Sequence, residues 1–166
     1  MYRIGIGKAE AEVVSGRDLL LGGVNVSSEY GLEAVRDGDI ISLAVCDALM
    51  GCAGFGGIND MFPLSAPEYR DALSFELLTD VFVRIANFGY RVGNVDIILN
   101  SPIDISSYTA EIQSKISIIL ETNRINIKTA MSSNAECVAT VLCDQNLLTK
   151  RNREVLAIRN PGTMNN

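Results

Sequence analysis

The stretch from Gly31 to Pro63 reads GLEAVRDGDIISLAVCDALMGCAGFGGINDMFP and decides the fold prediction. Asp37 and Asp39 stand just before a run whose apolar residues have helical spacing: Ile40, Leu43, Ala44, Ala48 and Leu49. A carboxylate at the N-cap accepts hydrogen bonds from the first N–H groups of a helix. Four glycines then end the run: Gly51, Gly54, Gly56 and Gly57. We predict one helix here, with Asp37 or Asp39 as its cap rather than a catalytic acid.

The remaining pattern predicts strands and helices in mixed order. Short β-rich runs cover residues 3–7 and 12–26, and a helix is expected from about Ala72 to Asn87. Val92 to Leu99 is almost continuously apolar, which favours a strand covered on both faces. A third helix starts at Ser106 or Ser107, and strands follow near 125–129 and 137–143. The prediction is an α/β fold of the α+β type, a two-layer sandwich with helices on one face of a mixed sheet.

Composition points to one compact domain. The 166 residues are 48% hydrophobic and 20% charged, enough apolar material for one core. Apolar runs stay short of the ~20 residues that cross a bilayer, and no leader precedes the first strand, so we expect no membrane span. We expect a cytoplasmic location, or an organelle interior if a transit peptide has been removed. The net charge of −6 argues against nucleic-acid binding. Four cysteines without Cys-x-x-Cys spacing are expected to be buried free thiols.

Several motifs follow one another in a fixed order. They are Arg3-Ile4-Gly5, Leu20-Leu21-Gly22-Gly23-Val24, Asp37-Gly38-Asp39, Asp47-Ala48-Leu49-Met50-Gly51, Phe62-Pro63, Gly89-Tyr90, Gly93-Asn94-Val95-Asp96 and Asn126-Ile127-Lys128-Thr129. Over roughly residues 2–148 this series resembles the 2-C-methyl-D-erythritol 2,4-cyclodiphosphate synthase family of isoprenoid biosynthesis. The resemblance implies a homotrimer with active sites between subunits. It also implies a metal-dependent ring closure that releases cytidine monophosphate.

The zinc ligands that the resemblance implies are missing. The family holds zinc with an Asp-x-His pair after the first strand and a further His in the next helix, and these positions align with Ala9, Ala11 and Leu43. The chain contains no histidine at all, so zinc at this site is not expected. A slipped alignment would offer Glu10 and Glu12 as a replacement pair, and this alternative stays open.

Other parts of the family's site also differ. Val35-Arg36 replaces a His-Ser pair, and Gly57-Ile58-Asn59 replaces an Asp-x-Gly motif. The segment after Lys128 reads Ala130-Met131-Ser132-Ser133, without the Glu that binds a second metal, and Pro102-Ile103-Asp104 replaces a Pro-Lys nucleotide loop. We therefore predict a degenerate member that has no catalytic residue, metal ligand or cofactor.

Two groups of residues remain candidates for binding. An anion could bind in the vestigial pocket through Lys8, Arg36, Ser132 and Ser133. Residues 149–166 form a basic C-terminal arm beyond a domain of residues 1–148, and its cations are candidates for binding a protein partner: Lys150, Arg151, Arg153 and Arg159.

Three functions follow from these predictions. The leading one is a non-catalytic homotrimeric scaffold or interaction module. The first alternative is an active cyclodiphosphate synthase with a rebuilt site, a phosphorus–oxygen lyase that releases cytidine monophosphate. The second alternative is a sensor that binds a nucleotide or an isoprenoid diphosphate without turnover.

Overall fold

A computed structural model describes residues 1–33 and 36–145, and its centre is a five-stranded sheet. The strand order is β4-β1-β7-β5-β6, and of the adjacent pairs only β5 and β6 run parallel. The strand bounds are β1 Tyr2–Ser15, β4 Tyr30–Glu33, β5 Tyr90–Ser101, β6 Ile125–Met131 and β7 Ala135–Gln145. A separate hairpin joins β2 Leu19–Leu21 to β3 Val24–Ser27.

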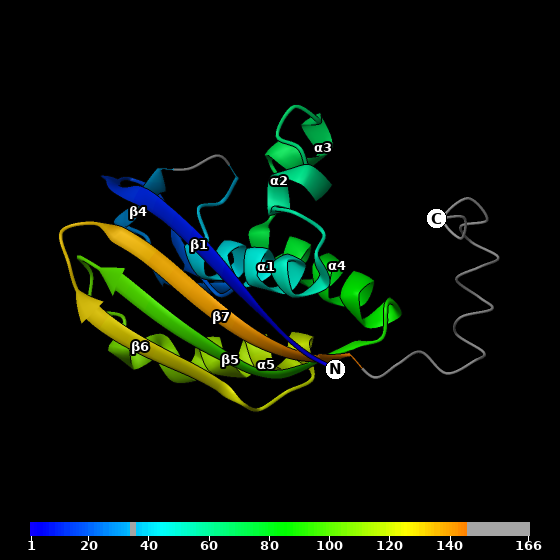
Figure 1. The fold of residues 1–166 in the computed structure, drawn as a ribbon. Helices are drawn as coiled ribbons and strands as arrows, with labels where there is room; N and C mark the ends of the chain where they lie inside the picture. The colour runs from blue at the N-terminus through cyan, green and yellow to red at the C-terminus, as the bar shows by residue number, and fades with distance from the viewer. Residues whose placement is uncertain (34–35, 146–166) are drawn as a thin grey trace.

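The long helices cover one side of this sheet (Figure 1). They are α1 Ile40–Ala53, α4 Ser74–Asn87 and α5 Thr109–Leu120. Two short helices, α2 Ile58–Met61 and α3 Pro67–Arg70, lie between α1 and α4 in the chain, and a 3-10 turn at Ser106–Tyr108 leads into α5. The predicted α+β sandwich with helices on one face of a mixed sheet is therefore confirmed. The two short helices and the strand β4 were not predicted.

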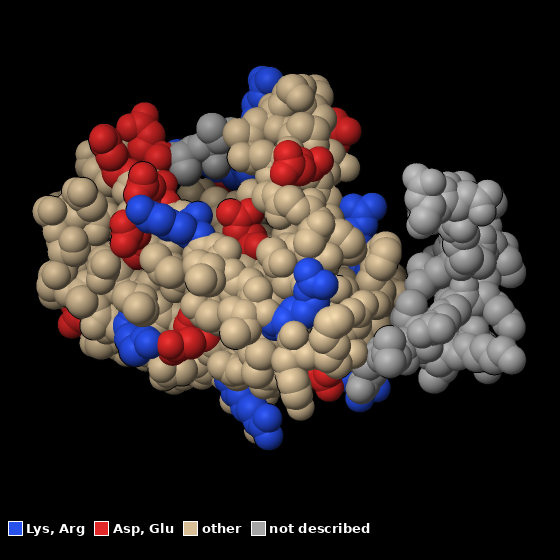
Figure 2. Space-filling view, viewed as in Figure 1, with Lys and Arg blue, Asp and Glu red and all other residues tan. Residues whose placement is uncertain are grey.

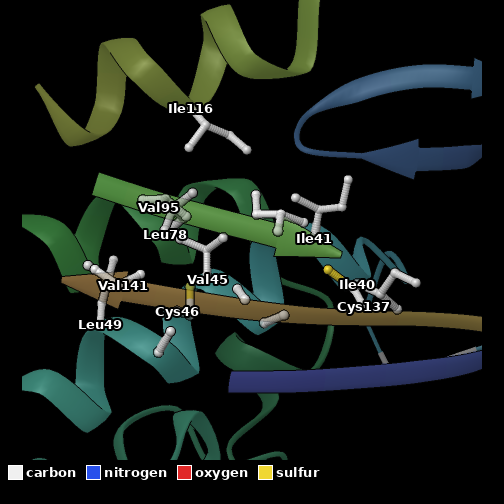
Figure 3. Packing of buried hydrophobic residues seen from close by; sticks show 14 of the residues in the cluster. Ile40, Ile41, Val45, Cys46, Leu49, Leu78, Val95, Ile116, Cys137 and Val141 are labelled. Atoms are coloured by element: carbon white, nitrogen blue, oxygen red, sulfur yellow. The ribbon is translucent and has the colours of Figure 1, made fainter. Parts of the chain in front are cut away.

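The core lies between the sheet and the helices α1, α4 and α5 (Figure 3). Ile41, Val45 and Leu49 of α1 are buried, as are Val95 of β5 and Val141 of β7. All four cysteines are free thiols within this core, as predicted.

One strand prediction is wrong for the described chain. In β5 the buried residues alternate, with Val95, Ile97 and Leu99 on the helix side, while the side chain of Ile98 is 44% exposed. The strand is thus covered on one face only, because none of the described residues forms a second layer on the other side of the sheet (Figure 1). The continuous apolar run was misleading because it supplies both a buried face and an exposed apolar face.

Two glycines let α1 approach β1 closely. A Cβ atom on Gly5 would overlap the carbonyl oxygen of Ala48, and one on Gly7 would overlap that of Ala44. Both obstacles are helix backbone, so no change of rotamer relieves them. Ala9 and Ala11, which share the face of β1 that carries Gly5 and Gly7, therefore pack on the helix side of the sheet.

Gly5→Ala is expected to lower the free energy of unfolding by about 2–3 kcal/mol, because the added methyl overpacks the helix–sheet contact. Urea unfolding would measure the change. Gly51→Ala is the matched control, since a Cβ there meets only ordinary contacts at 3.5 Å and beyond and Ala favours a helix. Equal stability of the two variants would contradict the close-packing account.

Val35 and the C-terminal arm, residues 149–166, lie outside the described residues. Within residues 1–33 and 36–145, no helix is both long and apolar enough to span a membrane.

Candidate functional site

The positions that the resemblance aligns with the family's zinc ligands carry apolar side chains. Ala9 and Ala11 of β1 and Leu43 of α1 are partly buried and pack against the core. None of the three side chains has an atom that can donate a lone pair to a metal. The donor set at this place therefore does not fit zinc.

Glu10, which lies between Ala9 and Ala11, forms an ion pair on the other face of β1. Lys8 Nζ lies 2.9 Å from Glu10 Oε2 and 2.9 Å from Glu136 Oε2. The hydrogen bond that Lys8 donates to Glu10, followed by the one that it donates to Glu136, raises the pKa of Lys8. Within residues 1–33 and 36–145, no group of three or more Cys, Asp or Glu side chains is placed to hold a metal ion.

Asp39 is a structural carboxylate at the start of α1. Its Oδ1 accepts hydrogen bonds from the N–H groups of Gly22 (2.8 Å) and Ser42 (3.0 Å). Its Oδ2 accepts from the N–H of Gly23 (2.8 Å) and the hydroxyl of Ser42 (2.7 Å). Asp39 is the N-cap of α1, so the prediction of a cap is confirmed. The same side chain also fastens the β2–β3 hairpin to the helix.

Asp37 performs a related task at the start of α4. Its carboxylate accepts from the N–H of Ser74 at 2.9 Å and from the Ser74 hydroxyl at 2.5 Å. Asp47 accepts from the N–H of Ile58 at 2.7 Å, at the start of α2. These carboxylates have backbone partners that account for their presence without a reaction.

Stability should depend on the pH through Asp39. Burial raises its pKa above the ordinary value of 3.8, and its hydrogen bonds partly oppose that rise. The folded chain therefore keeps the proton at pH values where the unfolded chain has lost it, and stability decreases as the pH rises through the raised pKa. Asp39→Asn does not titrate. We therefore expect the difference in free energy of unfolding between the wild type and Asp39→Asn to be largest below pH 3.8 and to shrink toward neutral pH. Urea unfolding at several pH values would measure it. An advantage that grows with pH would contradict this assignment.

The structure does not bring the four candidate anion-binding residues together. Lys8 of β1 lies opposite Val138 of β7, whereas Ser132 and Ser133 lie in the turn from β6 to β7. Arg36 instead holds the segment that contains α2 and α3. Its Nε donates to the carbonyl oxygen of Tyr69 at 3.0 Å, and its Nη2 donates to that of Phe62 at 2.7 Å. The structure thus gives Arg36 internal partners, and anion binding by these residues stays a prediction.

Acidic groups dominate the end of the sheet near Lys8. Glu10 faces Glu136 across β1 and β7, and Glu12 faces Glu33 across β1 and β4. Figure 2 shows Asp and Glu side chains gathered at the β4 side of the molecule. A phosphate approaching Lys8 would therefore meet more negative than positive charge.

The segment aligned with the family's nucleotide loop is also acidic. Asp104 lines a small hollow of about 80 Å³ with Ser101, Ile103 and Met131. The N–H of Ser106 donates to the Asp104 carboxylate at 2.9 Å and lowers its pKa. Asp104 therefore carries a negative charge at neutral pH, which repels a nucleotide phosphate.

An apolar patch on the open face of the sheet was not predicted from the sequence. Tyr2, Ile4 and Ile6 of β1 are 74%, 66% and 68% exposed, and Ile98 of β5 belongs to the same face. The signal was present as alternation along β1, where large apolar residues at even positions alternate with Arg3, Gly5 and Gly7.

The fold and the motif series together define a protein of the cyclodiphosphate-synthase type. The model of the YgbB family matches residues 2–142. The chain belongs to this family.

Individual relatives agree with this assignment. The chain is 38% identical over 130 residues to 2-C-methyl-D-erythritol 2,4-cyclodiphosphate synthase of Desulfatibacillum aliphaticivorans, covering 76% of this chain and 83% of the relative. The bifunctional IspDF of Campylobacter jejuni superposes with a TM-score of 0.83 at 26% identity, over 88% of this chain and 43% of that longer chain. A 2C-methyl-D-erythritol-2,4-cyclodiphosphate synthase in a CDP-bound form gives a TM-score of 0.81 at 26% identity, over 86% and 100% of the two chains.

Proposed function

We propose that this chain keeps the fold of the cyclodiphosphate synthases but serves as a non-catalytic scaffold or interaction module. The observation that carries the proposal is the apolar character of Ala9, Ala11 and Leu43 at the positions of the zinc ligands. Ring closure joins two phosphate groups, so it requires positive groups that stabilise charge developing on phosphoryl oxygens. Asp104 and the glutamates around Lys8 supply charge of the wrong sign.

The proposed assembly is a homotrimer formed through the open face of the sheet. Tyr2, Ile4, Ile6 and Ile98 expose apolar surface on β1 and β5, the two strands that flank β7. Exposed apolar side chains gathered on one face are typical of an interface between proteins. The C-terminal arm remains a candidate for binding a further partner.

The second candidate is an active synthase with a rebuilt site. The comparisons taken alone favour this candidate, because the matched relatives are named as cyclodiphosphate synthases. It requires a charge-neutralising group that takes the place of zinc, and Glu10 and Glu12 are the nearest oxygen ligands. Glu10 is paired with Lys8, so a metal would have to displace that cation.

Turnover of the family substrate, the cytidine-diphosphate ester of methylerythritol 2-phosphate, separates the two candidates. The full-length chain would be assayed for release of cytidine monophosphate with added Zn²⁺ and Mg²⁺ or Mn²⁺, beside an active relative as the positive control. We expect no release above the rate without protein. Release that a chelator abolishes would overturn the scaffold proposal and establish the synthase.

A further inference from the structure

We propose that a hollow beside the C-terminal end of α5 binds a neutral sugar. The hollow is shallow and open to solvent, and its volume is about 660 Å³, enough space for a small molecule. Its walls come from the start of β5, the second half of α5 and the connection to β6, three segments that lie together in Figure 1. None of the positions aligned with the zinc ligands lines it, so the proposal is independent of the function proposed above.

The polar side of the hollow has free hydrogen-bonding groups. Ser114 and Ser117 project from α5, and Glu121 and Arg124 come from the connection to β6. In the described part of the chain, these four side chains make no ion pair and no hydrogen bond with another residue. Lys8 and Arg36, by contrast, are engaged by internal partners. The groups in the hollow therefore remain available to a ligand.

The kinds of group present favour a neutral ligand with adjacent hydroxyls. Glu121 contributes one negative charge and Arg124 one positive charge, so the lining has no net charge with which to select an ion. A carboxylate only accepts hydrogen bonds and a guanidinium only donates them, whereas a hydroxyl does both. Neighbouring hydroxyls of one sugar can therefore donate to Glu121 and accept from Arg124 together.

Apolar groups beside the polar wall match the other side of a sugar ring. Val92 of β5 and Ile118 of α5 line the hollow, and Ile118 is 76% exposed. The C–H face of a sugar would cover this surface and remove it from water. Two backbone features shape the hollow: the register of β5 shifts between Val92 and Asn94, and Glu121 has a φ of 52°. A bulge of this kind changes the direction of a strand and its side chains.

A titration of the full-length, ¹⁵N-labelled chain with D-glucose, D-ribose and inorganic phosphate tests the proposal by NMR. At least one of the two sugars should shift the amide signals of Ser117, Glu121 and Arg124 in a saturable manner. The dissociation constant should be on the order of millimolar, as expected for a small ligand in an open site. Glu121→Gln and Arg124→Met should each weaken binding about tenfold, because hydrogen bonds to charged groups contribute on that order.

Arg70→Met is the matched control, since Arg70 is also an exposed arginine but lies on α3, away from the hollow. It should leave the dissociation constant unchanged. The proposal is overturned if neither sugar gives saturable shifts at these amides. Saturation by phosphate alone, or equal effects of Arg124→Met and Arg70→Met, would overturn it as well.

Discussion

Asp39→Ala should lower the free energy of unfolding by about 4 kcal/mol or more. The substitution leaves the N–H groups of Gly22, Gly23 and Ser42, together with the Ser42 hydroxyl, without their acceptor in a fully buried place. A buried donor without a partner costs about 1–3 kcal/mol, and several are affected here. The loss also separates the β2–β3 hairpin from α1. Chemical unfolding followed by circular dichroism measures the change.

Asp80→Ala provides the matched control for that experiment. Asp80 is an exposed residue within α4, so its removal should change stability by no more than about 0.5 kcal/mol. If Asp39→Ala lowered the free energy of unfolding no more than Asp80→Ala, the proposed role of Asp39 in connecting α1 to the β2–β3 hairpin would be wrong. A carboxylate kept for catalysis at the cost of stability would then be the better interpretation.

Ile6→Asp should convert the proposed trimer into monomers. Ile6 is 68% exposed in the single chain and lies in the middle of the apolar patch on the open face of the sheet. A carboxylate buried there without a partner would cost about 3 kcal/mol or more per subunit, which corresponds to at least about a hundredfold weaker association. Sedimentation velocity of wild type and variant at matched concentrations measures the assembly.

Val83→Asp tests whether any exposed apolar residue would have the same effect. Val83 of α4 is 52% exposed but lies in the helical layer, so the trimer should persist. A wild-type chain that sediments as a monomer would refute the proposed assembly directly. A trimer that Val83→Asp disrupts and Ile6→Asp does not would place the interface on the helices instead.

The helices were predictable because their signals are local. The spacing of Ile40, Ala44 and Ala48 and the cap at Asp39 each depend on residues within one or two turns. For the helix predicted at 72–87, the end at Asn87 is confirmed and only the start differs. The predicted start at Ala72 is two residues early, since α4 begins at Ser74. The backbone N–H of Ser74 donates to the carboxylate of Asp37, which is distant in the sequence.

Features that depend on distant contacts could not be predicted from the residues alone. The second role of Asp39, binding Gly22 and Gly23, requires the hairpin to fold back onto α1. The internal partners of Arg36 lie about thirty positions away in the chain, so a free cation was a reasonable hypothesis. The hollow at α5 joins segments whose proximity follows only from strand order, and the sequence gives no signal for it.

The candidate zinc site depends both on local sequence and on contacts between distant elements. The alignment placed Ala9, Ala11 and Leu43 at the ligand positions, and the structure shows these residues packed as apolar side chains. Close contact of β1 with α1 at Gly5 and Gly7 is what holds the two elements together at this place. Under the scaffold proposal, the β1–α1 contact is retained at this place while the side chains offer no metal ligand.

Zinc content after dialysis, determined by mass spectrometry of the full-length wild-type chain, tests the central claim most directly. A variant that combines Ala9→Asp, Ala11→His and Leu43→His serves as the comparison, because it restores three protein ligands to the retained scaffold. The account predicts no stoichiometric zinc in the wild type and about one ion per chain in the variant. Stoichiometric zinc bound by the wild-type chain would contradict it.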